Sequence, residues 1–166
     1  MTENCQDLKQ RYSFADYLYW SLMAAVPLLT AATAIAAVSL LWLGVYLLVL
    51  LAGLLTLCRF FCSHCPHYGR SGKTVKCLFL WGLPKFFEPR RGPLGWRAKG
   101  LSLLAAVAMV LFPLYWLLDQ PGQLLVYAVA LTAVGMTLRR HECSRCIYFD
   151  CPANRVPVER RTGTGA

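Results

Sequence analysis

Charged side chains are missing from two long stretches of the chain. No Asp, Glu, Lys or Arg occurs from Tyr17 to Leu57, and only Asp119 interrupts the stretch from Gly100 to Leu138. Ionisable residues inside a membrane mark ion and proton pathways, and haem in a helical bundle needs buried His, so the sequence predicts neither ion-coupled transport nor intramembrane haem. It also lacks a Ser-His-Asp arrangement, a phosphate-binding loop and a dinucleotide fingerprint. Nothing in it predicts an enzyme.

The two uncharged stretches are instead strongly apolar. Of the 166 residues, 57% are hydrophobic, and the mean hydropathy is +0.47. A helix of about 20 apolar residues spans a bilayer, so each stretch is long enough for two crossings. No amphipathic period shows a side that faces water. We therefore expect an all-α integral membrane protein with four transmembrane helices, near residues 17–37, 43–60, 99–118 and 124–140.

An internal repeat relates the two halves at an offset of 81 positions. The pattern T-L-x-R-x-x-C-S-x-C begins at Thr56 and again at Thr137, and S-L-x-A-A-V begins at Ser21 and at Ser102. The break at residues 119–123, which contains Pro and Gly, maps through the offset onto residues 38–42. A repeat of this length predicts two similar transmembrane hairpins. Both Cys motifs must leave the membrane on the same side, so the repeats are parallel rather than inverted.

Basic residues orient the chain. All 17 Lys and Arg residues fall before Asp16, in the loop 59–99 or from Arg139 onward, and the two hairpin turns have none. Cytoplasmic loops collect Lys and Arg, so both termini and the central loop are predicted to be cytosolic, in a cytoplasmic (inner) membrane. The net charge of +9 then reflects orientation and attraction to anionic lipid headgroups rather than binding of nucleic acid.

Six segments follow from this topology. They are a cytosolic N-terminal segment (1–16), a first hairpin (17–60), a cytosolic Cys-containing and interfacial loop (61–98), a second hairpin (99–140), a cytosolic Cys motif (141–157) and a disordered tail (158–166). In the interfacial loop, aromatic and basic residues intermix, which predicts a short surface helix near residues 75–83, broken at Pro84. Lys85, Arg90 and Arg91 are candidates to contact lipid headgroups or a protein partner at the cytosolic face.

Eight cysteines accompany this topology, and four of them form two C-x-x-C motifs. The cytosol keeps thiols reduced, so clustered cysteines there indicate metal or redox chemistry rather than structural disulfides. Two such motifs supply the four thiolates that tetrahedral zinc prefers. We therefore predict one shared structural zinc site on Cys62, Cys65, Cys143 and Cys146, in an accessory or interaction protein.

Other ligand sets and roles stay open. Cys77 and Cys151 follow the two motifs, and His64, His67 and His141 lie beside them, so two separate sites of three Cys and one His are possible from the sequence. The thiols also suit an iron–sulfur cluster in an electron-transfer subunit, a carrier of soft Cu(I) or Hg(II), or a dithiol–disulfide redox pair. Cys58 lies at the membrane edge, and Cys5 has no partner thiol at chelating spacing.

Overall fold

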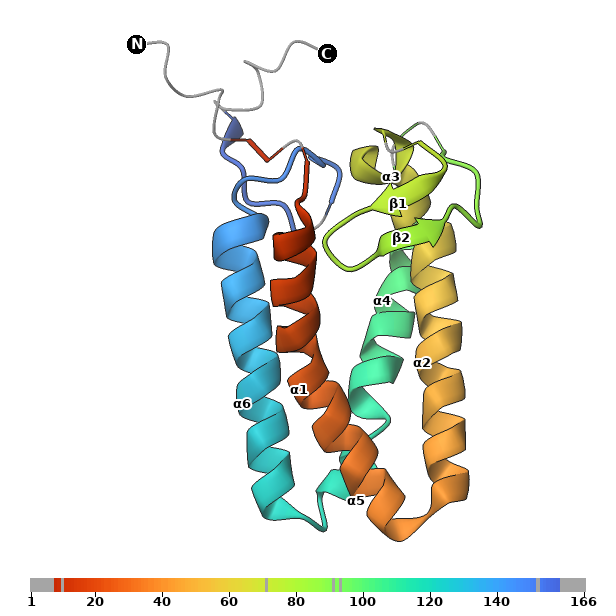
Figure 1. Cartoon of the computed structure of the whole chain (residues 1–166), viewed down its shortest axis with the longest axis vertical. Helices are drawn as coiled ribbons and strands as arrows, with labels where there is room; N and C mark the ends of the chain where they lie inside the picture. Colours follow the sequence, from red (N-terminus) through yellow and green to blue (C-terminus); the bar gives the residue numbers. More distant parts are fainter. Residues whose placement is uncertain are drawn as a thin grey trace.

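The computed structural model of the chain describes residues 8–9, 11–70, 72–90, 92, 94–151 and 153–158. Helices α1 (Phe14–Val38), α2 (Leu40–Phe60), α4 (Trp96–Leu111) and α6 (Pro121–Thr137) form the body of the molecule (Figure 1). The one-turn helix α5 (Leu114–Leu117) continues α4 after a break, and the π-helical turn η2 (Leu138–Glu142) continues α6. With these extensions, four helices within the described residues are long and apolar enough to cross a membrane, as predicted.

The ends of the helices follow local sequence. Ser13 caps α1, because its hydroxyl accepts a hydrogen bond from the backbone N–H of Asp16 while the Asp16 carboxylate accepts one from the backbone N–H of Ser13. Pro113 lies at the break between α4 and α5, as expected of a residue without a backbone N–H. Helix α2 begins at Leu40 and α6 at Pro121, which are separated by the 81 positions of the sequence repeat. The duplication itself remains a prediction.

Each long helix packs mainly on a helix of the other half of the chain. The principal contacts are α1 with α6 and α2 with α4, and α1 also meets α2 and α5 (Figure 1). At the end of the bundle where α5 lies, a buried cluster joins Ala34, Ile35, Tyr46, Trp116 and Tyr127. Exchanging α1 with α4 and α2 with α6 interchanges the two principal contacts, but among the described residues the contact of α1 with α2 has no counterpart of similar extent between α4 and α6.

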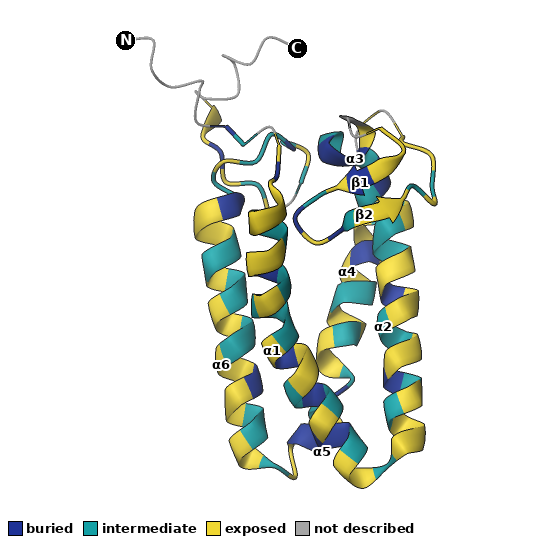
Figure 2. Ribbon diagram, in the orientation of Figure 1, coloured by how far each residue is buried: buried dark blue, intermediate teal, exposed yellow. Residues whose placement is uncertain are grey.

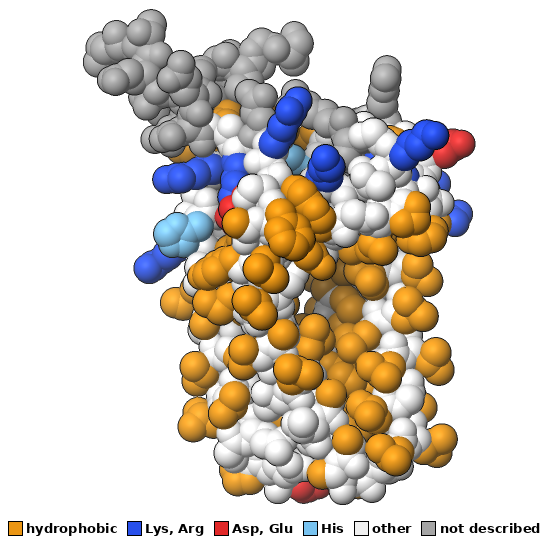
Figure 3. Space-filling view, viewed as in Figure 1, with side chains coloured by type: hydrophobic (Ala, Val, Ile, Leu, Met, Phe, Trp, Pro, Cys, Tyr) orange, Lys and Arg blue, Asp and Glu red, His pale blue; other side chains and the backbone are white. Residues whose placement is uncertain are grey.

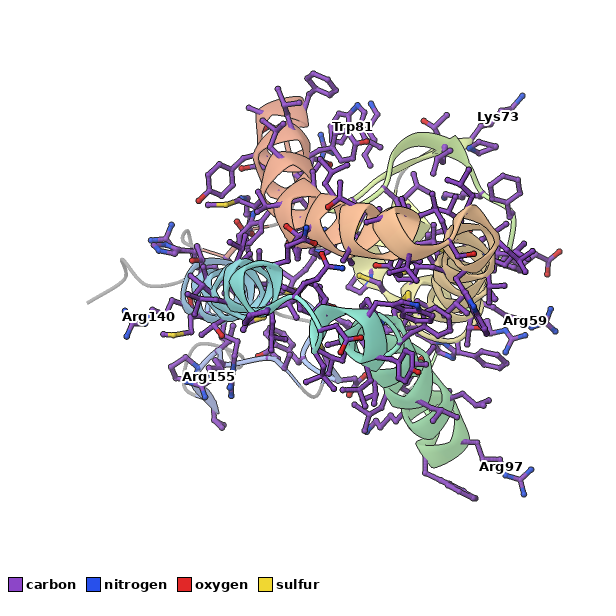
Figure 4. The ribbon with its side chains drawn as sticks, turned by 90° about the horizontal axis from the view of Figure 1, so that it is seen from below. Arg59, Lys73, Trp81, Arg97, Arg140 and Arg155 are labelled. Carbon is purple, nitrogen blue, oxygen red and sulfur yellow. The ribbon has the colours of Figure 1, made fainter. Side chains whose placement is uncertain are left out.

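The outer surface of the bundle is apolar. Leu48, Leu103 and Leu125 each expose about two thirds of their surface (66%, 67% and 65%), and exposed positions run along all four long helices (Figure 2). Exposed leucines in this number suit contact with lipid rather than water. Lys and Arg side chains gather at one end of the molecule (Figure 3), and those labelled in Figure 4 point outward from the ribbons. The structure is consistent with an all-α membrane protein.

The prediction of a surface helix near residues 75–83 is wrong. Strands β1 (Thr74–Lys76) and β2 (Trp81–Pro84) form an antiparallel hairpin there. The backbone N–H of Cys77 donates to the carbonyl of Leu80 at 2.8 Å, and Gly82 adopts φ +76°, a conformation that strongly favours glycine. The β-branched residues Thr74 and Val75 also favour a strand. Aromatic and basic content indicated where this segment lies but not which backbone it adopts.

Candidate functional site

Three segments assemble at the basic end of the bundle. We call them the cap: the described residues among 8–13, 61–95 and 143–158. The backbone N–H of Lys9 donates to the carbonyl of Arg145 at 2.8 Å, and the N–H of Arg90 donates to the carbonyl of Ser63 at 2.8 Å. The ring of Tyr12 contacts that of His67, with centroids 4.8 Å apart. The N-terminal segment therefore touches both Cys motifs.

The two C-x-x-C motifs leave their helices in the same way. The hydroxyl of Ser63 donates to the carbonyl of Arg59 at 2.6 Å, and the hydroxyl of Ser144 donates to that of Arg140 at 2.5 Å. Both bonds run four residues back along the chain, at positions related by the repeat. The ring of Phe61 meets that of Tyr148 edge to face, with centroids 5.8 Å apart. The motifs thus lie side by side at one end of the molecule, as predicted.

Four thiols lie together beside β1. Cys58, Cys62, Cys65 and Cys77 pack against the buried side chains of Tyr68, Val75 and Leu80. The thiols of Cys58 and Cys62 are hydrogen-bonded to each other. Cys146 comes from the second motif and interacts electrostatically with Cys65 and Cys77. The first motif, the hairpin and the second motif therefore each contribute a thiol to one region.

Backbone N–H groups lie near three of these sulfurs. Those of His67 and Tyr68 lower the pKa of Cys65, and those of Leu78 and Phe79 lower the pKa of Cys77, against the larger opposite effect of burial. Cys146 accepts a hydrogen bond from the N–H of Tyr148, with N and Sγ 3.5 Å apart. In each case the N–H group follows the cysteine by one to three residues, so the local turn brings it near the sulfur. Such bonds stabilise a charged sulfur more than a neutral one.

Burial opposes this stabilisation. Loss of solvent raises the pKa of the Cys65 thiol to about 12 and that of Cys146 to about 11, with neighbouring thiols adding to the shift. Burial also raises the pKa of Cys77 and of Cys143. With no cation beside them the thiols are protonated at neutral pH. A bound metal reverses this balance, because its charge deprotonates a coordinating thiol outright.

The predicted ligands do not stand at coordinating positions. In the described part of the chain, no group of three or more His, Cys, Asp and Glu side chains is arranged to hold a metal ion, and the seven described cysteines are all free thiols. Cys143 lies near Cys151 and Cys146. Cys77 was expected only as a further candidate, but it interacts electrostatically with both Cys62 and Cys65. Cys143 is not among the principal interactions of either thiol. Cys5 lies outside the described residues.

The three histidines occupy different surroundings. Nδ1 of His64 lies 3.1 Å from the carbonyl oxygen of Phe60 and 3.3 Å from the hydroxyl of Ser63, so that nitrogen is engaged at the end of its own helix. His67 is buried against Tyr12. His141 is exposed and lines a cavity that has no cysteine among its described lining residues. Their predicted roles as ligands stay predictions.

The basic residues proposed for lipid or partner contact also have different surroundings. The Nζ of Lys85 donates to the carbonyl of Gly69 at 3.4 Å and lies 5.7 Å from the ring centre of Tyr68. Arg90 is exposed and lines an open groove of about 890 Å³ together with Cys65 and Tyr148. Arg91 lies outside the described residues. Cys65 of the first motif lines one part of this groove, and residues 147–150, which follow the second motif, line another.

Sequence reasoning missed a polar cluster at Glu142. This carboxylate is buried, with only 8% of its surface exposed, and Oε1 accepts from the Nζ of Lys9 at 3.1 Å and from the Nε1 of Trp20 at 3.3 Å. The same Nζ donates to Oδ1 of Asp16 at 3.0 Å. Lys9, Trp20 and Glu142 are far apart in the sequence, and only an acidic residue inside a basic run hinted at a specific role for Glu142.

Comparison with protein-family models, curated proteins and solved structures finds no match for the chain.

Proposed function

We propose that the chain is a membrane-embedded accessory protein whose cytosolic cap holds one soft metal ion, with zinc favoured. Cys62, Cys65, Cys77 and Cys146 are the proposed ligands, so Cys77 takes the place that the sequence assigned to Cys143. The main support is the grouping of these thiols: Cys62, Cys65 and Cys77 pack against one buried cluster, and Cys146, whose sulfur accepts from the backbone N–H of Tyr148, interacts with Cys65 and Cys77. Turns that donate to sulfur favour thiolates, and clustered thiolates require a cation.

The charge balance supports this proposal. Buried thiolates beside one another repel, and the neighbouring sulfurs of Cys62, Cys65 and Cys77 have no Lys or Arg among their principal electrostatic contacts. Zinc bound to four thiolates would neutralise half of their charge and fill a tetrahedral site with bonds of about 2.3 Å. Because these thiols already interact with one another, small movements of their side chains would bring the four sulfurs to the ion.

The distribution of basic residues supports a cytosolic position for the metal site. With Lys and Arg collected on the cap side, the positive-inside rule puts the cap in the cytosol, where thiols remain reduced. The ion would tie the loop after α2 to the segment after η2, and so link the two halves of the chain at one end. The exposed groove beside Cys65 and Arg90 then presents the metal-bound cap to a protein partner.

Elemental analysis of the purified protein tests the proposal. We expect about one zinc per chain and a colourless preparation. Ser replacements of Cys62, Cys65, Cys77 or Cys146 should each remove most of the metal, whereas Cys143→Ser should retain it. Cys143→Ser is a matched control, because Cys143 is the repeat equivalent of Cys62.

Each other outcome is decisive. If Cys143→Ser loses the metal and Cys77→Ser keeps it, the ligand set predicted from the sequence replaces ours. If the preparation is brown and contains iron and sulfide, the cap carries an iron–sulfur cluster for electron transfer. If the protein is isolated without metal and takes up neither zinc nor another soft ion, the metal proposal is wrong.

A further inference from the structure

A second site lies beside the thiol cap, at the ends of α1 and α6. The structure has a cavity of about 620 Å³ there, lined by polar and aromatic side chains that include Lys9, Asp16, Trp20, His141, Glu142 and Arg145. Its volume lies within the range of small-ligand pockets. None of its described lining residues is a cysteine, so its role is independent of the metal proposal.

The carboxylate of Glu142, a lining residue of this cavity, has an unused acceptor. Oε1 is engaged by Lys9 and Trp20, but Oε2 is buried and has no hydrogen-bond partner among the described residues. A buried carboxylate oxygen without a donor is costly, so native structures usually supply one. A ligand that brings an N–H or O–H group would remove this cost.

A metal ion is a poor candidate for that position. Lys9 stands between the two carboxylates and already neutralises charge there, within 3.0 Å of Asp16 and 3.1 Å of Glu142. The other oxygen of Asp16 accepts hydrogen bonds from the backbone N–H and the hydroxyl of Ser13. Ca²⁺ needs six or more oxygen ligands, and Mg²⁺ needs near-ideal octahedral geometry. The free oxygen suits a single strong donor such as an ammonium group.

The rest of the lining suits an anion next to that ammonium. Arg145 and His141 are exposed, and neither forms an ion pair with any residue in the part of the chain that the structure describes. Lys9 and Arg145 balance Asp16 and Glu142 in charge when His141 is neutral, so the cavity favours a ligand with both signs of charge. A guanidinium at the cavity binds phosphate well.

The position of the cavity indicates where such a ligand comes from. Tyr19, Trp20 and Thr137 line it from the two helices that run on into the apolar span. Trp is typical of headgroup depth in a bilayer. On the same helix, Leu18 and Leu22 are exposed (47% and 62%), so acyl chains could lie along α1 below the cavity.

We propose that this cavity binds the headgroup of an amine-bearing phospholipid of the phosphatidylethanolamine type. The ammonium donates to Oε2 of Glu142, and the phosphate lies against Arg145 and His141. Phosphatidylcholine offers the same charges but no N–H donor, and phosphatidylglycerol offers phosphate without an ammonium. Comparison of the three lipids therefore tests recognition of the ammonium separately from recognition of the phosphate.

Native mass spectrometry and thermal unfolding of the full chain in mixed micelles test this proposal. The lipids are dioleoyl phosphatidylethanolamine, dioleoyl phosphatidylcholine and dioleoyl phosphatidylglycerol, and soluble phosphoethanolamine is a fourth probe. We expect the ethanolamine lipid to be retained at least fivefold better than the other two and to raise the unfolding temperature most. Glu142→Gln should abolish this preference, and Arg145→Ala should weaken binding. Arg155→Ala is the control, because Arg155 is a basic, exposed cap residue outside the cavity lining.

The remaining outcomes are also informative. Equal retention of the choline or glycerol lipid would overturn the proposal, as would an unchanged preference in Glu142→Gln. Binding of soluble phosphoethanolamine with no preference among the lipids would assign the site to a free metabolite of the same chemistry instead. Thermal unfolding in phosphatidylcholine micelles reports whether Glu142→Gln folds, and Arg145→Ala tests the site if it does not.

Discussion

Helix α2 packs closely on α4 where Gly53 faces Met109. A Cβ at position 53 would lie 2.5 Å from Sδ, 2.8 Å from Cγ and 3.2 Å from Cε of Met109. Gly53→Ala should therefore force the Met109 side chain to move. Overpacking costs roughly 1–3 kcal/mol, and we expect the lower half of that range because Met is flexible.

The control for this change is on the same helix. Gly44 has nothing within 4 Å of the position of an added Cβ, so Gly44→Ala changes the helix propensity without a clash. The unfolding free energy in mixed micelles should be lower for Gly53→Ala than for Gly44→Ala by about 1–2 kcal/mol.

A double-mutant cycle makes the test specific. Once Met109→Ala has opened space, Gly53→Ala should cost nothing further, and the coupling between the two positions should be about 1 kcal/mol or more. Equal stabilities of Gly53→Ala and Gly44→Ala, or additive effects of Gly53→Ala and Met109→Ala, would refute the packing of α2 on α4.

Three further predictions concern topology, backbone and pH. A cysteine introduced as Gln123→Cys should react with an external membrane-impermeant reagent in intact cells, and reaction only after permeabilisation would reverse the orientation. Gly82→Ala should destabilise the protein by about 1 kcal/mol, because φ at this position is +76°, while Gly72→Ala should be neutral; thermal unfolding of the two variants measures the difference. In metal-free protein, the raised pKa values of Cys65 (about 12) and Cys146 (about 11) stabilise the folded state below pH 9, where unfolded thiols are also protonated. This stabilisation should be lost progressively as the pH rises from about 9 to 12, whereas zinc-loaded protein should not show the loss, and chemical unfolding at each pH checks both.

The membrane-spanning helices were predictable because their signal is local. A bilayer helix requires a run of apolar residues of fixed length, and the chain interrupts such runs only where it turns. The turn between α1 and α2 was also available from the sequence, through the 81-residue offset that maps Gln120 onto Ser39. Local composition did not decide between helix and strand at residues 75–83, because aromatic and basic residues occur in both. There the positive φ of Gly82 and the antiparallel pairing of β1 with β2 decide the backbone.

The composition of the sites depended on contacts between distant residues. Repeat symmetry predicted that Cys143 would join Cys62, and that ligand set stays a prediction. The hairpin also brings Cys77 to the first motif, a contact that the repeat does not contain because Cys77 has no equivalent in the second half. Glu142 could not be recognised from sequence, since its character comes from burial and from Lys9 and Trp20, which approach it through the packing of α1 on α6. The sequence alone therefore determined that the chain is apolar, helical and rich in thiols at one end. Only the tertiary structure decided which helices pack together, which thiols meet and where a buried carboxylate lacks a partner, because those properties arise from contacts across the whole chain.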